Sequence, residues 1–263
     1  MLIFLKLGGS LITDKDKPYT ARKTVIARIA GEINAAWQEQ SDLRILLGHG
    51  SGSFGHFAAK DYGTRERVTN SAEWQGFQKV WNAARALNQI IVEEFSQAGL
   101  PVISLPASAS VFTENRKIVE WNTKPIQSAL ENELMPIIFG DVIFDKSLGG
   151  IIFSTEDLFT QLLPIVQPDR ILLAGKEAGV WRDYPNVSEI IPVIDAASFR
   201  SGRVGVGASA SVDVTGGMAA KVQLMLEVVT AYPQIQAQIF SGEEPGNIYK
   251  MLTGASLGTR IQS

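Results

Sequence analysis

The chain has no cysteine in its 263 residues, which excludes disulfide bonds, thiolate zinc sites and thiol nucleophiles. It also lacks an excess of charge of either sign, because 24 Lys and Arg stand against 27 Asp and Glu, a formal net charge of −3. A chain so near neutrality has no general attraction for nucleic acid or for an anionic membrane. We therefore expect neither as a partner, and any anion must be bound by a local site.

Long hydrophobic runs are absent as well. The apolar N-terminal run before Lys6 is too short for a secretory signal, and no run approaches the roughly 18 apolar residues that span a bilayer. The sequence therefore predicts a cytoplasmic protein. Histidine is also scarce: the chain has only His49 and His56, and both lie in one glycine-rich segment.

What is present is an alternation of short Leu-rich or β-branched runs with longer stretches of helical period. This pattern predicts βαβ units and a largely parallel sheet. We expect strands near 2–7, 44–47, 102–105, 136–139, 170–174, 237–240 and 258–261, a β-hairpin from 142–144 and 151–153, and helices near 21–40, 72–97 and 245–252 with another ending near 229. Without repeats or a long linker, residues 1–263 are expected to form a single domain, with an N-terminal lobe of about 1–160 and a C-terminal lobe of about 161–263.

Lys6, Gly8 and Gly9 follow the first predicted strand. The carboxyl ends of parallel strands are where open α/β sheets bind ligands, and glycines let backbone N–H groups approach a phosphate closely. The segment therefore indicates a phosphate site. An ordinary tight turn beside an exposed lysine would have the same sequence.

The second glycine segment contains Gly50-x-Gly52-x-x-Gly55, the spacing of the dinucleotide fingerprint. A nicotinamide site needs a strand that ends in an acid about 20 residues further on, and here that region is polar and precedes a helix. The P-loop spacing occurs nowhere in the chain. We interpret the segment as a phosphate cradle of another kind, whose final residue His56 could donate to an anionic substrate or be purely structural.

A third glycine segment, residues 213–218, precedes a predicted helix that carries Lys221 one turn in. A helix N-terminus attracts anions, although a solvated lysine after a flexible loop is an alternative. Three glycine turns with Lys6, Lys15 and Lys221, and no nucleophile–base pair, favour phosphoryl transfer, which needs mostly positioning and charge neutralisation. If the acceptor is itself a phosphate, its anionic oxygen needs no strong general base.

Taken together, these segments resemble the amino-acid kinase superfamily, and within it they look most like isopentenyl phosphate kinases. The resemblance is carried by Lys6-Leu-Gly-Gly-Ser10 with Thr13-Asp14-Lys15, by residues 49–56, by Gly140-Asp141, and by residues 213–218 with Lys221. It implies an α/β fold, an open αβα sandwich around a central, largely parallel sheet. It also implies a homodimer that uses ATP and Mg²⁺ to convert isopentenyl phosphate to isopentenyl diphosphate.

The resemblance further implies roles for individual residues, with no protein ligand assigned to the metal. The implied catalytic residues are Lys6, Lys15, His56 and Lys221. The implied nucleotide-binding residues are Lys6, Gly8, Gly9, Ser10, Gly52, Gly217 and Lys221. The implied substrate-binding residues are Ser51, Gly55, His56, Thr155 and Glu156.

Three segments depart from the family pattern. Ser51 replaces the middle of three glycines, and Ser154-Thr155-Glu156 stands where Ser-Gly-Asp is usual. The family pattern on the nucleotide side has two acidic residues, and residues 174–181 keep only one of them, as Glu177. These departures leave open a regulatory or storage protein that binds a phosphorylated metabolite without catalysis. Fosfomycin kinases share the histidine-ended loop, so a kinase for fosfomycin is another alternative, and a carboxylate acceptor such as glutamate is less favoured.

An apolar stripe at helical spacing bears on the acceptor. It consists of Trp74, Phe77, Trp81 and Leu87. Such a stripe could wall a slot for a short hydrocarbon tail, or it could simply pack against the sheet.

Overall fold

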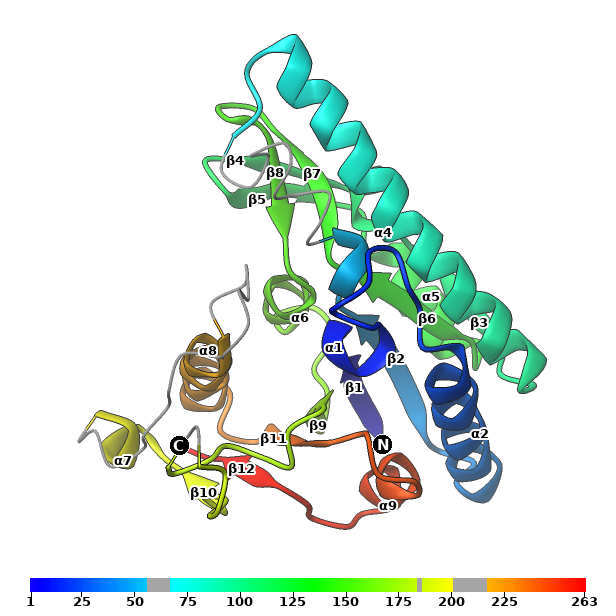
Figure 1. Ribbon diagram of the computed structural model, residues 1–263, viewed down its shortest axis with the longest axis vertical. Coiled ribbons are helices and arrows are strands. Elements are labelled where there is room, and N and C mark those ends of the chain that lie inside the picture. The colour runs from blue at the N-terminus through cyan, green and yellow to red at the C-terminus, as the bar shows by residue number, and fades with distance from the viewer. Residues whose placement is uncertain (56–66, 184–185, 201–216) are drawn as a thin grey trace.

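The computed structural model describes residues 1–55, 67–183, 186–200 and 217–263, and Figure 1 shows their arrangement. The strands are β1 (Leu2–Leu7), β2 (Arg44–His49), β3 (Val102–Ser104), β4 (Val111–Glu114), β5 (Lys117–Trp121), β6 (Met135–Phe139), β7 (Asp141–Asp145), β8 (Gly149–Phe153), β9 (Arg170–Gly175), β10 (Val193–Ile194), β11 (Gln236–Ser241) and β12 (Thr259–Ile261). The helices are α1 (Gly9–Ile12), α2 (Lys23–Glu39), α4 (Ser71–Gln97), α5 (Lys124–Glu131), α6 (Thr155–Leu162), α7 (Ala196–Arg200), α8 (Gly217–Ala231) and α9 (Asn247–Leu252), with a 3-10 turn η1 (Ala107–Ala109).

The central sheet has eight strands in the order β10-β12-β11-β9-β1-β2-β6-β3. β1 lies in its interior and pairs in parallel with β2 on one side and with β9 on the other, whereas β12 is antiparallel to β11. The chain completes the β2-β6-β3 side first and then crosses to β9 and the other side. The strand order therefore reverses between β1 and β9, which is where open α/β sheets bind ligands beyond the carboxyl ends of the strands.

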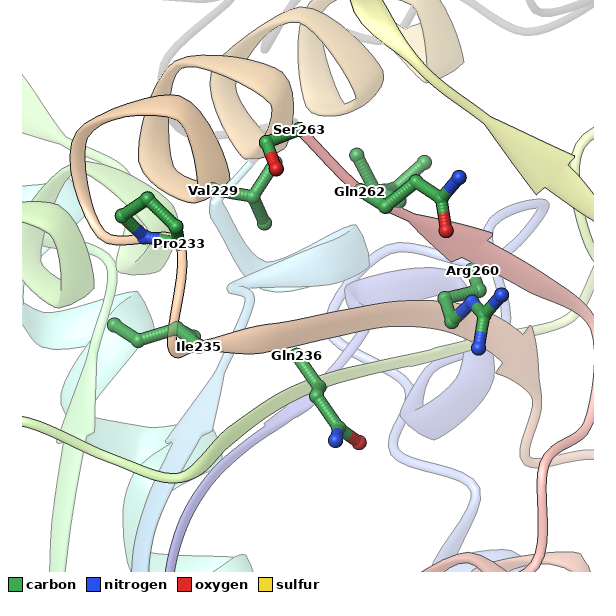
Figure 2. A pocket seen from close by; sticks show the side chains of 8 residues that line it. Val229, Pro233, Ile235, Gln236, Arg260, Gln262 and Ser263 are labelled. Atoms are coloured by element: carbon green, nitrogen blue, oxygen red, sulfur yellow. The ribbon is translucent and has the colours of Figure 1, made fainter.

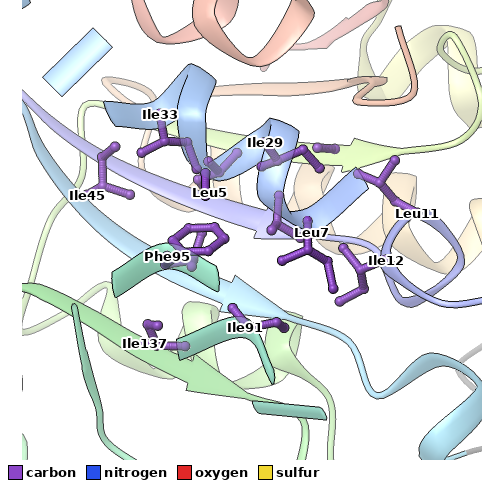
Figure 3. Packing of buried hydrophobic residues seen from close by; sticks show 14 of the residues in the cluster. Leu5, Leu7, Leu11, Ile12, Ile29, Ile33, Ile45, Ile91, Phe95 and Ile137 are labelled. Atoms are coloured by element: carbon purple, nitrogen blue, oxygen red, sulfur yellow. The ribbon is translucent and has the colours of Figure 1, made fainter. Parts of the chain in front are cut away.

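Helices cover both faces of this sheet, so the predicted open αβα sandwich with a largely parallel sheet is confirmed (Figure 1). On one face α2 and α4 pack on β1, β2 and β6; Figure 3 shows Ile29 and Ile33 of α2 near Leu5 of β1, and Ile91 of α4 near Ile137 of β6. On the other face α6 and α8 pack on the alternate residues of the same strands, such as Phe4 of β1. The central strands are buried on both faces, which is why they read as continuous apolar runs in the sequence.

A second sheet of four strands, β5-β4-β7-β8, lies beyond the carboxyl end of β6. The predicted hairpin is confirmed as β7–β8, but its partner hairpin β4–β5 was not predicted. The β4–β5 turn is made by Asn115 and Arg116, both with positive φ, instead of by the Asn-Gly or Asp-Gly pair that marks such turns in a sequence. The carboxylate of Asp145 stabilises this turn by accepting from the Asn115 and Arg116 N–H groups.

The apolar stripe of α4 packs against both sheets. Phe77 and Leu87 are buried in the core, and Trp74 and Phe77 form an aromatic cluster with Phe144 of β7, with ring centroids 5.1 to 5.9 Å apart. The indole N–H of Trp81 donates to Ser108 Oγ at 3.2 Å. Of the two alternatives for this stripe, the structure shows packing. Within the described ranges, no helix is both long and apolar enough to cross a membrane.

Candidate active site

Lys6 occupies the carboxyl end of the innermost strand and points to the α6 face. Side chains alternate along a strand, so Lys6 shares the face of Phe4, whose ring packs on Phe159 of α6 with centroids 5.0 Å apart. On that face Lys6 Nζ forms an ion pair with Oε1 of Glu156 in the first turn of α6, and both side chains are buried. A buried charge needs such a partner, because an uncompensated one would be costly.

Glu156 brings a second cation to the same place. Burial raises the pKa of its carboxyl, but the charges of Lys6 and of Lys221 on α8 lower it more, so the pKa lies below its ordinary value. Glu156 is therefore ionised at neutral pH, pairs with Lys6 and interacts with the charge of Lys221. Lys6 and Lys221 come from opposite halves of the chain, and the charges of both act on this one carboxylate beside the ligand edge of the sheet.

The turn after β1 contacts the second glycine segment directly. Gly8 N–H donates to the Ala174 carbonyl of β9 at 2.8 Å, which fixes the turn across the switch point. A Cβ atom on Gly9 would lie 2.5 Å from the backbone nitrogen of Gly52, which is closer than the Cβ atom of a real side chain comes to a neighbouring atom. Gly9 is thus needed for the two glycine turns to meet, and Ser10 follows it, half-buried, in α1.

Thr13 joins the two glycine turns with a single hydroxyl. Its fully buried Oγ1 donates to the Gly9 carbonyl at 2.7 Å and accepts from the Ser53 N–H at 2.9 Å. Gly52 passes over this hydroxyl with a φ of +49°, and a Cβ there would lie 2.1 Å from Thr13 Oγ1. The relative position of the two turns is therefore set by Thr13 together with these glycines.

Lys15 lies in a loop closed by pairing of Thr13 with Ala21, with Asp14 N–H donating to the Thr20 carbonyl at 2.9 Å. The loop also contacts the second glycine segment, because Thr20 N–H donates to Ser53 Oγ at 3.3 Å. Lys15 itself is half-buried. The structure thus brings the segments that carry Lys6, Lys15 and Lys221 to the edge of the sheet where the parallel strands have their carboxyl ends.

Ser51 fits the loop in place of the family's glycine. Its φ is not positive, so the serine side chain causes no backbone strain. Its carbonyl accepts from the Phe54 and Gly55 N–H groups at 3.1 and 3.2 Å, which folds residues 52–55 into a helical turn. His56 and residues 213–216 lie outside the described residues, and Gly217 is the first residue of α8 with a φ of +68°.

Thr155 and Glu156, predicted to contact substrate, make contacts within the protein. Thr155 is buried and its hydroxyl donates to the His49 carbonyl at 2.6 Å, and Glu156 pairs with Lys6 as described. Their substrate contacts stay a prediction. In the 174–181 segment, the Glu177 carboxylate accepts from the Trp181 indole N–H at 2.7 Å.

Two polar residues near the site were missed by the sequence reasoning. Thr13 was noted only as part of a motif, and His49 was given no role although it is one of two histidines. Nothing in the local sequence indicates that Thr13 reaches Ser53. The position of His49 at the end of a strand, directly before the glycine segment, was the available signal.

A pocket of about 150 Å³ lies elsewhere, between the end of α8 and the strands β11 and β12 (Figure 2). Gln236, which lines it, is the first residue of β11 and pairs with Arg170, the first residue of β9. The pocket is therefore at the amino ends of the parallel strands, opposite the edge where Lys6 lies. It takes no part in the site.

We compared the chain with protein families, with characterised proteins and with solved structures. Residues 1–241 match the model of the amino acid kinase family. The chain is 32% identical to an isopentenyl phosphate kinase of Methanocaldococcus jannaschii, over 99% of this chain and 98% of that one, and 30% identical to one of Methanothermobacter thermautotrophicus with the same coverage. A solved structure of an isopentenyl phosphate kinase matches the whole of both chains at 28% identity with a TM-score of 0.82. The match spans both halves of the sheet, and this chain belongs to the amino acid kinase family.

Proposed function

We propose that this protein transfers the γ-phosphate of ATP to isopentenyl phosphate and releases ADP and isopentenyl diphosphate. The observation that carries the proposal is the grouping of Lys6, Glu156 and Lys221 at the carboxyl edge of the sheet, beside two glycine turns in contact. The likeness to isopentenyl phosphate kinases over the full length supports the choice of acceptor.

The reaction requires charge to be neutralised more than it requires a base. An oxygen of the acceptor phosphate attacks the γ-phosphorus, the bond to the β–γ bridging oxygen breaks, and its electron pair leaves with ADP. The attacking oxygen is already anionic, so no proton has to be removed. Lys6 and Lys221 offset the negative charge that spreads over the transferring group, and Glu156 keeps the Lys6 ammonium group in place.

The remaining predicted residues divide between the two substrates. We assign Gly8, Gly9, Ser10, Gly52 and Gly217 to the nucleotide phosphates and Ser51, Gly55 and His56 to the acceptor phosphate, with Lys15 at the transferring group. The N-terminal lobe of about 1–160 would then carry the acceptor and the C-terminal lobe of about 161–263 the nucleotide. The contact of Gly9 with Gly52 supports this assignment, because it brings the two predicted phosphate sites side by side.

Mg²⁺ would enter with ATP and neutralise charge on its β- and γ-phosphates. This ion keeps waters and phosphate oxygens as its main ligands. One carboxylate oxygen at the site, Glu156 Oε2, is buried and has no hydrogen-bond partner among the described residues. It fits as an acceptor for a water molecule bound to the ion.

We also propose that the protein is a cytoplasmic homodimer, as the resemblance implies. Ile103 on β3, the terminal strand of the large sheet, is 38% exposed, which supports an interface at that edge. Light scattering coupled to size exclusion tests the dimer, and a monomer at micromolar concentration would contradict it.

The acceptor is tested by measuring ADP release from Mg-ATP with isopentenyl phosphate, fosfomycin and glutamate in parallel. The proposal predicts turnover on isopentenyl phosphate, with kcat/KM far above those for the other two. Turnover on fosfomycin or glutamate instead would keep the chemistry and overturn the acceptor. No ADP release with any acceptor would favour a binding protein.

A further inference from the structure

His49 is buried at the end of β2, directly before the glycine segment. Its side chain is inaccessible to solvent, and its ring stacks on Phe139 of β6 with centroids 5.1 Å apart and planes at 12°. Its main-chain carbonyl accepts from Thr155 Oγ1 and, at 3.3 Å, from Gly140 N–H. The residue therefore contacts the segments that lead into α6 and β7 as well as the glycine turn.

The hydrogen bonds of the ring determine which nitrogen carries the proton. His49 Nε2 lies 3.1 Å from the side-chain nitrogen of Asn88, a group that can only donate. At the other end of this amide, Asn88 Oδ1 accepts from Ser104 Oγ at 2.6 Å. His49 Nδ1 lies 3.2 Å from the Gly50 carbonyl, which can only accept, so the proton of the neutral ring is on Nδ1 and Nε2 accepts from Asn88.

These bonds hold the two successive peptide planes on either side of Gly50. Gly50 N–H donates to the Leu7 carbonyl of β1 at 3.0 Å, and the Gly50 carbonyl accepts from His49 Nδ1. In a trans peptide the C=O of one residue and the N–H of the next point in opposite directions. With the Gly50 carbonyl drawn toward the His49 ring, the Ser51 N–H points away from it.

We propose that His49 is a positioning residue that, through its Nδ1–H bond to the Gly50 carbonyl, aims the Ser51 N–H at the acceptor phosphate. The proposal rests on the proposed function, which places the acceptor phosphate at Ser51. His49 touches no reacting atom and acts only through the backbone of the turn. Asn88 donates to the other ring nitrogen, Nε2, and so favours the same tautomer.

Two substitutions separate this role from simple packing. The amide nitrogen of asparagine in His49→Asn takes the place of Nδ1, so it keeps the donor to Gly50. The amide of glutamine in His49→Gln takes the place of Nε2, so it keeps the contact with Asn88 and loses that donor. We expect His49→Gln to raise the KM for the acceptor by about tenfold or more, and His49→Asn by no more than about threefold.

Each variant is first compared with the wild type in thermal unfolding, and kinetics are measured well below the lower midpoint. Lys23→Met, at an exposed position at the start of α2, serves as the control, and its acceptor KM should stay close to wild type. Equal KM values for His49→Asn and His49→Gln would overturn the proposal, because packing alone would then explain the residue.

A second readout does not depend on any activity. Long-range ¹H–¹⁵N correlation spectra of the wild-type protein report the tautomer of each histidine, and His49→Asn identifies the His49 signals. The proposal predicts a neutral ring protonated on Nδ1 at pH 7. A ring protonated on Nε2 would overturn it even if isopentenyl phosphate is phosphorylated, and the Nδ1 form without phosphorylation would overturn only the proposed function.

Discussion

Lys6 at the end of β1 and Glu156 at the start of α6 form a buried ion pair across a separation of 150 positions in the chain. The pair connects the innermost strand of the sheet to the helix that follows the small sheet. Lys221, on a third element, lowers the pKa of the same carboxyl. The charges of two lysines from distant parts of the chain thus act on a single buried acid.

Lys6→Met should lower kcat by about 10²- to 10³-fold and leave the acceptor KM nearly unchanged, because it removes charge needed mainly in the transition state. Lys23→Met, at an exposed position at the start of α2, is the matched control and should behave like the wild type. Steady-state kinetics in Mg-ATP test this prediction. A kcat for Lys6→Met within about threefold of wild type would contradict the role of the lysine.

Thr13→Val should lower the free energy of unfolding by about 1–3 kcal/mol, because it leaves the buried Ser53 N–H without an acceptor while keeping the shape of the side chain. Thr13→Ser keeps the hydroxyl and should lose less. Urea titrations of both variants give the comparison. If valine were tolerated as well as serine, the hydroxyl would not be what joins the two glycine turns.

Gly9→Ala should prevent the two glycine turns from meeting, since its Cβ would lie 2.5 Å from Gly52 N. We expect it to abolish phosphoryl transfer. Gly31→Ala is the control: it lies in α2 with no atom within 4 Å of the added Cβ, and should stabilise the helix by about 0.5–1 kcal/mol. Activity and thermal unfolding are measured on both. Full activity in Gly9→Ala would contradict the contact.

Stability should fall in acid because of His49. Burial lowers the pKa of its ring from 6.5 to about 4, and the nearby charge of Lys6 contributes in the same direction. Between these two values the unfolded chain binds a proton that the folded chain does not, so the free energy of unfolding should decrease by about 1.4 kcal/mol for each pH unit below 6.5 until pH 4.

Urea unfolding of the wild type and of His49→Gln between pH 7 and pH 4 tests this dependence. The difference in stability between the two proteins should shrink as the pH falls, since glutamine does not titrate. A constant difference across this range would mean that the His49 ring is not held neutral by the fold.

The sequence was informative where local rules apply. The central strands were predicted because runs buried on both faces are continuously apolar, and the position of Lys6 followed from the end of such a run. The β4–β5 hairpin was missed because Asn115 and Arg116 adopt positive φ without a glycine. Periodicity located α4 correctly, but it could not decide whether Trp74 and Phe77 line a slot or pack, which depends on Phe144 of the other sheet.

The contacts that build the site could not be predicted in the same way. Thr13 reaches Ser53 and Lys6 reaches Glu156 only after the strands have been placed, and no spacing rule encodes either pair. Thr155 and Glu156 were predicted as substrate contacts from their motif position, whereas their side chains in this structure bond to His49 and Lys6. That a lone histidine such as His49 is buried and neutral is likewise a property of its surroundings.

The most direct test of the central claim is ³¹P NMR of the protein with Mg-ATP and isopentenyl phosphate, with Lys6→Met as the inactive control. The account predicts that the monophosphate signal is replaced by the two signals of a diphosphate monoester while ADP forms in equal amount. Unchanged isopentenyl phosphate, with ATP either intact or hydrolysed to inorganic phosphate, would contradict it.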